Sequence, residues 1–208
     1  MFITFEGPDG SGKTTQFRRA VAALRTAGYD VVATREPGGT PISDQVREVL
    51  LNRPDNVAMS PQAEVLLFSA SRAQHVTELI RPALAAGQIV VSDRFYDSTL
   101  AYQGYGYGLD IDALRAITAF ATGGLTPDLT IFLDCPPEEG LRRRAAGQVK
   151  WDRLDDKPLD FHHRAYQGYQ QLIAAEPGRW AVIDARQGPD QVFAQIVTAL
   201  RARGLRLG

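Results

Sequence analysis

The sequence predicts an α/β fold built on a parallel sheet. Short apolar runs alternate along the chain with longer stretches in which apolar residues recur at helical spacing. Two of the short runs, at 89–91 and 129–133, are almost uninterrupted, as expected for strands that are buried on both faces. The chain has 208 residues and no recognisable interdomain linker, so we expect one domain spanning residues 1–208.

The expected strands and helices alternate in order, and several have clear end signals. Strands are predicted at 2–5, 29–34, 89–91, 129–133 and 180–183. Helices are predicted at 14–27, 42–50, 61–86 and 191–202. Gly28 and Gly87 mark helix ends, and Ser60 followed by Pro61 is typical of a helix start. Pro82 is expected to kink or divide the third helix.

Composition and charge exclude several classes of protein. Hydrophobic residues make up 44% and charged residues 23% of the chain, which is ordinary for a folded domain. The net charge of -1 argues against a nucleic-acid partner, and no stretch reaches the roughly 18 apolar residues of a membrane span. The single cysteine, Cys135, excludes an intrachain disulfide. We therefore expect a cytoplasmic protein with neither a nucleic-acid nor a membrane partner.

A phosphate-binding loop follows the first predicted strand and opens the first predicted helix. The segment fits the pattern G-x-x-x-x-G-K-[ST], and its residues are Gly7, Pro8, Asp9, Gly10, Ser11, Gly12, Lys13 and Thr14. Its backbone N–H groups and the helix dipole are suited to a phosphate. Lys13 is expected to reach the β- and γ-phosphates of ATP, and the Thr14 hydroxyl is expected to bind Mg²⁺. The segment predicts nucleoside-triphosphate binding.

A second phosphate site is indicated where the 89–91 strand ends. Asp93 and Arg94 follow this strand, and ligands of open α/β sheets bind at that edge. The carboxylate can act on Mg²⁺ or on an attacking oxygen, and the guanidinium can clamp a phosphate. A signalling GTPase needs Asn-Lys-x-Asp, but neither Asn52 nor Asn56 precedes a lysine. No apolar strand ends in Asp-Glu, which disfavours the usual water-activating ATPases. The two sites together indicate a kinase with a phosphorylated acceptor.

Five segments together resemble the bacterial thymidylate kinases. They read GPDGSGKTT at 7–15, TREPGGT at 34–40, LFSASR at 67–72, DRF at 93–95 and AYQG at 101–104. The match runs in order over essentially the whole chain. The resemblance implies a P-loop kinase fold with a five-stranded parallel sheet flanked by helices and a mobile lid. It also implies transfer of the γ-phosphoryl group of ATP to dTMP with Mg²⁺, giving ADP and dTDP, in a homodimer.

The resemblance assigns roles around the acceptor phosphate and sugar. Asp9 matches the carboxylate that contacts the 3′-OH of dTMP, and Tyr102 matches the ring beneath the deoxyribose. Asp93 and Arg94 match the pair that supports Mg²⁺ and binds the acceptor phosphate. Arg35, with the turn that follows it, matches a loop near that phosphate.

Further residues are implied around the base. Phe68 matches the ring that stacks on thymine, and Arg72 matches the donor to its O4. Their four-residue spacing places both on one helix face. Thr99 matches a polar position near the thymine edge, and Gln103 matches another polar group of the site. For Phe68, ordinary core packing is the alternative interpretation.

The resemblance also implies an arginine-bearing lid at about 142–157. Gly10 stands where some relatives carry an arginine within the P-loop, and relatives without it supply arginine from the lid. Arg153 is expected to be the catalytic arginine of the lid. The other expected catalytic residues are Lys13 of the P-loop and Asp93 and Arg94 of the second phosphate site. The cationic candidates in this region are Arg142, Arg143, Arg144, Lys150 and Arg153. A solvated helix face is the alternative interpretation. Residues 103–108 and 147–157 lack periodicity and are predicted to be mobile loops.

Two other functions remain open from the residues alone. The first is another small-molecule P-loop kinase, such as a different nucleoside monophosphate kinase. The second is a regulatory or assembly ATPase that uses the nucleotide as a switch. A kinase is expected to consume ATP rapidly only with its acceptor, whereas a switch ATPase needs none.

Overall fold

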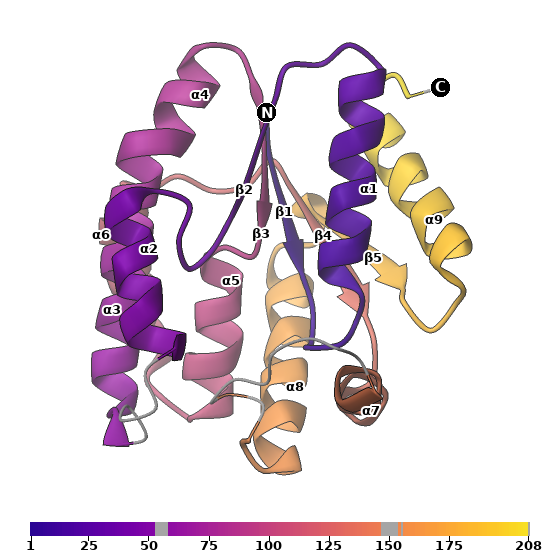
Figure 1. The fold of residues 1–208 in the computed structure, drawn as a ribbon. Helices are drawn as coiled ribbons and strands as arrows, with labels where there is room; N and C mark the ends of the chain where they lie inside the picture. Colours follow the sequence, from indigo (N-terminus) through magenta and orange to yellow (C-terminus); the bar gives the residue numbers. More distant parts are fainter. Residues whose placement is uncertain (53–57, 147–153, 155, 208) are drawn as a thin grey trace.

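The computed structural model describes residues 1–52, 58–146, 154 and 156–207. Strands and helices alternate along this chain (Figure 1). The strands are β1 (Phe2–Glu6), β2 (Val31–Arg35), β3 (Ile89–Asp93), β4 (Leu129–Asp134) and β5 (Trp180–Asp184). The α-helices are α1 (Lys13–Thr26), α2 (Pro41–Arg47), α3 (Pro61–His75), α4 (Arg81–Ala85), α5 (Tyr96–Thr99), α6 (Ile111–Thr122), α7 (Pro137–Ala146), α8 (Leu159–Ala175) and α9 (Pro189–Ala202). Short π-helical segments are η1 (Glu48–Asn52), η3 (Val76–Ile80) and η4 (Leu100–Gly106), and η5 (Pro177–Arg179) is a 3₁₀ turn.

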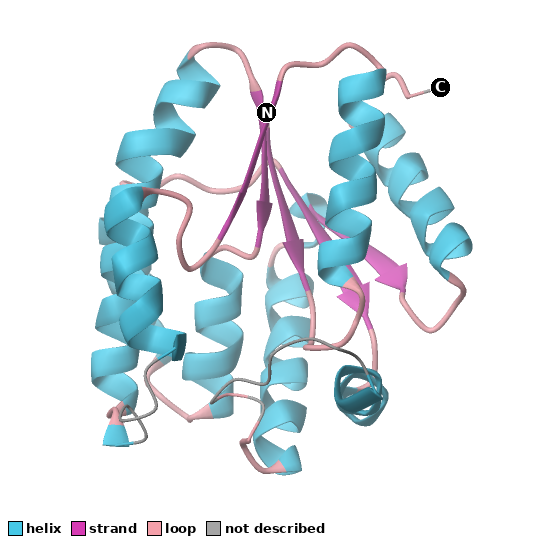
Figure 2. Cartoon of the chain, viewed as in Figure 1, coloured by secondary structure: helices cyan, strands magenta, loops and turns pink. Residues whose placement is uncertain are grey.

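The five strands form one parallel sheet in the order β2-β3-β1-β4-β5 (Figure 2). This confirms the predicted fold class. Because β1 is central, its carboxyl end lies beside the carboxyl end of β3, with Phe5 opposite Asp93. Arg35, at the end of β2, also lies opposite Asp93. The segments that follow these three strands therefore meet at one edge of the sheet.

Helices cover both faces of the sheet, so the central strands are buried on each side. One core lies between the sheet and helices α1 and α9, and it includes Ile3, Val91 and Leu133. The second core lies on the opposite face, under α3, α5, η4, α6 and α8, and it includes Phe2 and Phe132. Burial on both faces explains why the central strands read as continuous apolar runs.

The long helical stretch after Ser60 is divided as the sequence predicts. The Ser60 side chain accepts a hydrogen bond from the Ala63 N–H and caps α3. The π-helical segment η3 then interrupts the regular helix, and α4 begins at Arg81, with Pro82 in its first turn. This placement suits proline, because N–H groups in the first turn of a helix have no acceptor within the helix, so the N–H that proline lacks is not needed there.

The prediction of a mobile loop at 103–108 is wrong. Residues up to Gly106 belong to η4, where Gln103 and Gly104 are buried. The π-helical turn breaks the usual 3.6-residue spacing, so no helical periodicity is visible in the sequence. A Cβ at Gly104 would collide with Ile111, and one at Gly106 would collide with Phe161. These glycines allow close packing rather than mobility. The other predicted loop, 147–157, lies largely outside the described residues.

Candidate active site

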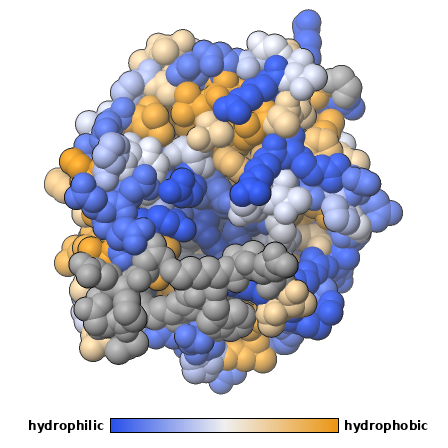
Figure 3. Space-filling model, viewed as in Figure 1, coloured by the Kyte–Doolittle hydropathy of each residue, from blue (hydrophilic) through white to orange (hydrophobic). Residues whose placement is uncertain are grey.

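A cavity of about 580 Å³ opens at the carboxyl edge of the sheet. Figure 3 shows a hollow bordered by hydrophilic residues on this face of the molecule. The described residues that the sequence predicted for dTMP binding, catalysis or Mg²⁺ all line it: Asp9, Lys13, Thr14, Arg35, Phe68, Arg72, Asp93, Arg94, Thr99, Tyr102 and Gln103. Of the other P-loop residues, Gly10 and Gly12 line the cavity, whereas Gly7, Pro8 and Ser11 do not. The fold thus gathers residues from five separate stretches of the sequence around one space.

The P-loop wraps around the Lys13 side chain. The glycines Gly7, Gly10 and Gly12 have φ angles of 142°, 75° and 90°, which L side chains rarely adopt. The Lys13 Nζ donates to the carbonyl oxygens of Gly7 and Pro8, both at 2.8 Å. Burial, followed by the nearby charge of Arg94, lowers the pKa of Lys13 to about 8. A phosphate in this loop would favour the charged ammonium.

Two oxygen ligands meet beside the P-loop lysine. The Thr14 hydroxyl donates to the Asp93 carboxylate at 2.7 Å, which brings the start of α1 to the end of β3. Hydroxyl and carboxylate oxygens are the donors that Mg²⁺ prefers, and the ion is usually held by one or two such groups together with nucleotide phosphates. The residues present therefore fit Mg²⁺.

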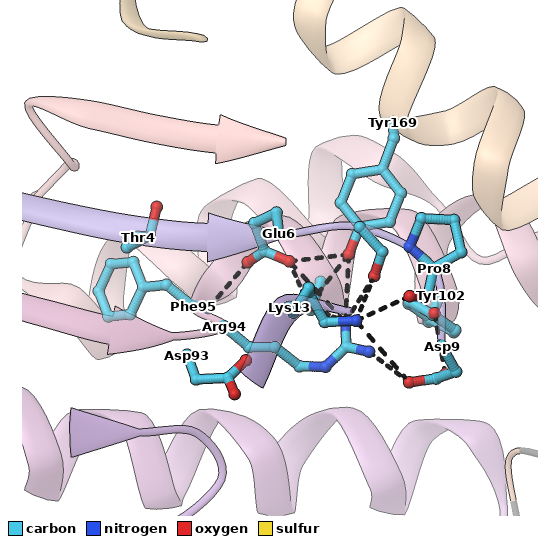
Figure 4. Close-up of polar contacts among 12 residues, drawn as sticks. Thr4, Glu6, Pro8, Asp9, Lys13, Asp93, Arg94, Phe95, Tyr102 and Tyr169 are labelled. Atoms are coloured by element: carbon cyan, nitrogen blue, oxygen red, sulfur yellow. Dashed lines mark hydrogen bonds and ion pairs between the residues drawn. The ribbon is translucent and has the colours of Figure 1, made fainter. Parts of the chain in front are cut away.

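The Asp9 carboxylate faces Arg94 and Tyr102 (Figure 4). Its Oδ1 accepts from Arg94 Nη2 at 2.6 Å, and its Oδ2 accepts from the Tyr102 hydroxyl at 3.0 Å. Burial alone would raise the pKa of Asp9, but the charges of Arg94 and Lys13 outweigh it and hold that pKa below its usual value. The carboxylate is therefore ionised on the acceptor side of the loop.

A buried arginine forms the deep end of the cavity. Arg72 is 1% exposed, and its Nε donates to Glu36 at 2.7 Å. Its Nη2 donates to the Thr99 hydroxyl at 3.1 Å. Within the described part of the chain, its Nη1 has no acceptor in hydrogen-bonding range. Since buried guanidinium groups normally use their donors, this N–H group is available to a ligand.

A chain of hydrogen bonds stands behind Arg72. The other Glu36 oxygen contacts His75 Nδ1 at 3.0 Å, and His75 Nε2 lies 2.7 Å from the Thr34 hydroxyl. The sequence placed Glu36 only in a loop near the acceptor phosphate, whereas its side chain supports Arg72. Phe68 lies one turn before Arg72 on α3. Its side chain is half-buried and lines the cavity. This favours a ligand-facing ring over core packing for Phe68.

Two more of the predicted substrate-binding residues, Gln103 and Arg35, line the cavity and contact acidic side chains. Gln103 is 2% exposed, and its amide donates to Glu64 at 2.6 Å. Arg35 is half-exposed and contacts Asp44 at 3.2 Å, so it lies at the cavity mouth.

Several residues of the site were missed from the sequence: Glu6, Ser98 and Tyr169 beneath Arg94, and His75 behind Glu36. Glu6 carried a usable signal. It is a charged residue at the end of an apolar strand, and burial there requires partners. Nothing in the local pattern marked Ser98, Tyr169 or His75.

Comparison with known proteins agrees with the geometry. The model of the family described as "Thymidylate kinase" matches residues 5–196. The chain is 52% identical over 204 residues to a thymidylate kinase of Deinococcus radiodurans, covering 98% of both proteins. It is 50% identical over 207 residues to one of Roseiflexus sp., covering 94% of this chain and 91% of that protein. The chain belongs to the thymidylate kinase family.

A solved structure of the family has the same fold. The crystal structure of thymidylate kinase from Ehrlichia chaffeensis superposes with a TM-score of 0.79 at 32% sequence identity, covering 96% of this chain and 98% of that one. Family membership makes the protein a phosphotransferase and confirms the resemblance read from the sequence. It disfavours the switch ATPase.

The P-loop of this chain leaves no room for an arginine at residue 10. A Cβ on Gly10 would overlap the backbone of Gly140 in α7, and the positive φ of Gly10 also disfavours any side chain. Arg143 and Arg144 of α7 line the cavity. Arg142 is 71% exposed, pairs with Glu139 and does not line it, which fits the solvated-face alternative for that residue. The candidates Lys150 and Arg153 lie outside the described residues.

Proposed function

We propose that the protein transfers the γ-phosphoryl group of ATP to dTMP, giving ADP and dTDP. The observation that carries this proposal is that one cavity contains both the P-loop lysine and the buried Arg72, whose Nη1 has no partner among the described residues. The first binds a nucleotide phosphate, and the second fits the O4 carbonyl of thymine. A coupled ADP-release assay over the common nucleoside monophosphates tests this, since fast turnover is expected only with dTMP.

The reaction depends on alignment and charge rather than on covalent catalysis. The P-loop amides and Lys13 hold the β- and γ-phosphates of ATP. Arg94 binds the dTMP phosphate, so that one of its oxygens faces the γ-phosphorus. Thr14 and Asp93 would hold Mg²⁺, which would supply positive charge to the phosphates there. The cationic side chains around the cavity then stabilise the charge of the transferring group.

The base and sugar are bound by the deeper residues. Phe68 stacks on thymine, Arg72 donates to its O4, and Thr99 and Gln103 complete the polar edge of the base pocket. Asp9 accepts a hydrogen bond from the 3′-OH of the deoxyribose, because its ionised carboxylate already faces that side of the cavity. The Arg35 guanidinium lies near the acceptor phosphate at the mouth of the cavity.

Tyr102 is expected to enforce deoxyribose over ribose. Its ring is 5% exposed and is fixed by the hydroxyl bond to Asp9, so a 2′-OH packed against it would have neither space nor a partner. The substitution Tyr102→Ala should lower the preference for dTMP, measured as kcat/KM for dTMP divided by kcat/KM for its ribose counterpart. Tyr102→Phe, which keeps the ring, should retain the preference. Equal weakening of both substrates in Tyr102→Ala would assign the ring a structural role only.

The arginines of the predicted lid are expected to act mainly in the transition state. Arg153→Ala should lower kcat by about tenfold or more with a smaller change in KM for dTMP, since such a contact strengthens as charge develops. A triple alanine variant at Arg142, Arg143 and Arg144 tests the described candidates in the same way. An unchanged kcat in both variants would contradict a lid arginine.

We also propose a cytoplasmic homodimer, supported by an apolar surface. Large apolar side chains on neighbouring elements are exposed: Ile42 of α2, Val49 of η1, Leu66 of α3 and Phe120 of α6. Phe120 is 90% exposed, and α3 contacts both α2 and α6. Large exposed apolar side chains on packed neighbouring helices are typical of an interface. Light scattering should give twice the chain mass for the wild type and a shift toward the monomer for Leu66→Glu with Phe120→Glu. A monomeric wild type would refute the dimer.

Two further findings concern membrane-spanning helices and the cysteine. No helix in the described part of the chain is long and apolar enough to cross a membrane. The single cysteine, Cys135, is buried and forms no disulfide within the chain.

A further inference from the structure

A fully buried carboxylate lies directly beneath Arg94. Glu6 ends β1 and is 0% exposed. Its Oε1 accepts a hydrogen bond from the Phe95 N–H at 2.8 Å. Its Oε2 accepts from the Ser98 hydroxyl at 2.6 Å and from the Tyr169 hydroxyl at 2.8 Å. Buried carboxylates are rare because they lose their hydration, so three donors on one group indicate a specific role.

Two of these three donors, the Ser98 and Tyr169 hydroxyls, also contact the Arg94 side chain, and Figure 4 shows Glu6 and Tyr169 beside Arg94. Arg94 Nη1 donates to the Ser98 hydroxyl at 2.9 Å and lies 3.9 Å from Glu6 Oε2. It also reaches the Tyr169 hydroxyl at 3.5 Å. One side of the guanidinium thus faces the Glu6 cluster, while Nη2 faces Asp9 at the cavity. We define the Glu6 cluster as Glu6, Ser98 and Tyr169.

The backbone of Arg94 is held in an unusual conformation. Its φ of 74° is the only positive φ of a non-glycine residue in the described chain. Such a conformation persists only where the surroundings hold it, and it is often found at functional sites. The peptide between Arg94 and Phe95 is fixed at both ends. Its carbonyl accepts from the Ser92 hydroxyl at 2.7 Å, and its N–H donates to Glu6.

We propose that Glu6 is a positioning residue that fixes the backbone and the guanidinium of Arg94 toward the acceptor phosphate, with Tyr169 orienting Glu6. The proposal rests on the proposed role of Arg94 as the clamp on the dTMP phosphate. A misplacement of about 1 Å at such a clamp lowers the rate by about 100-fold, so the carboxylate influences catalysis without touching substrate.

The electrostatics of Glu6 are consistent with a site kept for function rather than for stability. Burial raises the pKa of Glu6 to about 7, against the opposing charge of Arg94. Asp97 of α5 raises it further, whereas the bonds from Ser98 and the Phe95 N–H lower it. Because this pKa is raised above its unfolded value near 4.5, the folded state loses stability as pH rises from about 4.5 to about 7, and above that pH the full penalty of the ionised Glu6 is present. A neutral glutamine at this position removes that penalty.

The first test compares activity with thermal stability at pH 8. Glu6→Gln is expected to lower kcat/KM for dTMP by about 10- to 100-fold, to leave KM for ATP within about twofold, and to keep or raise Tm. Tyr169→Phe, which removes one donor to Glu6, should also lower kcat/KM for dTMP, by a smaller factor, and leave KM for ATP within about twofold; it serves if Glu6→Gln does not fold. A parallel fall of Tm and of activity with both substrates would show a structural role and overturn the proposal.

Asp97→Asn is the matched control, since Asp97 is another fully buried carboxylate. Its partner is Arg179, at 2.7 Å, and it does not contact Arg94. This variant should keep kcat/KM for dTMP within about twofold of the wild type, whatever its effect on Tm. A loss as large as that of Glu6→Gln would show that any buried carboxylate near β3 has the effect, and would overturn the assignment to Glu6.

A double-variant cycle with Arg94→Ala separates this proposal from the function on which it rests. If Glu6 acts through Arg94, adding Glu6→Gln to Arg94→Ala should change kcat/KM by no more than about twofold. If the two losses multiply, Glu6 does not act through Arg94, and only the positioning role is overturned. If Arg94→Ala alone retains wild-type kcat/KM for dTMP, the phosphate clamp itself is wrong, and the positioning role falls with it.

Discussion

Replacing Lys13 with alanine is expected to lower kcat by about 100- to 1000-fold while leaving the fold intact. The Lys13 ammonium is held by two P-loop carbonyls and is 7% exposed, so it is fixed before the nucleotide arrives. A fixed charge beside a transferring phosphate stabilises the transition state without reorganisation. Steady-state assays with saturating ATP and dTMP measure the effect.

Arg18→Ala provides the control for Lys13→Ala. Arg18 also lies on α1, but it is exposed and outside the cavity. Its removal should leave kcat within about twofold of the wild type. Circular dichroism should show the same helix content in both variants. Activity of Lys13→Ala within a few-fold of the wild type would refute the role given to the P-loop.

Replacing Arg72 is expected to affect both recognition and stability. Arg72→Gln should lower kcat/KM for dTMP by about 100-fold, the upper range for a hydrogen bond from a charged donor. It should also destabilise the fold by about 3–5 kcal/mol, because Glu36 remains buried without its cationic partner. Chemical denaturation and steady-state kinetics measure the two effects separately.

A double variant distinguishes the two roles of Arg72. Glu36→Gln added to Arg72→Gln removes the unpaired charge, so most of the lost stability should return while kcat/KM for dTMP stays low. The preference for dTMP over dCMP should also shrink, because cytosine presents an amino group where thymine presents O4. Recovery of activity together with stability would limit Arg72 to a structural role.

The sequence predicted most of the sheet and the catalytic edge because these depend on local signals. The P-loop glycines have positive φ angles that the motif requires, and Asp93 with Arg94 follows a strand that is recognisable by its apolar run. Helices α6, α7 and α8 were not predicted. Helix α7 is highly polar, so no apolar stripe marks it in the sequence.

The contacts that support the site depend on tertiary structure and could not be read locally. Tyr169 and Glu6 are separated by 163 positions and meet only because the fold brings α8 to the carboxyl end of β1. The positive φ of Arg94 has no sequence signal, since nothing distinguishes this arginine from one in an ordinary turn. Gly140 likewise matters only because α7 approaches the P-loop at Gly10.

The fate of the γ-phosphoryl group tests the central claim most directly. The protein is mixed with Mg²⁺, dTMP and ATP labelled with ³²P at the γ-position, and the products are separated by chromatography. The label should appear in dTDP, with little in inorganic phosphate, and ATP should be stable when dTMP is omitted. Label released mainly as inorganic phosphate, at a rate independent of dTMP, would contradict a dTMP kinase and would instead favour an ATPase.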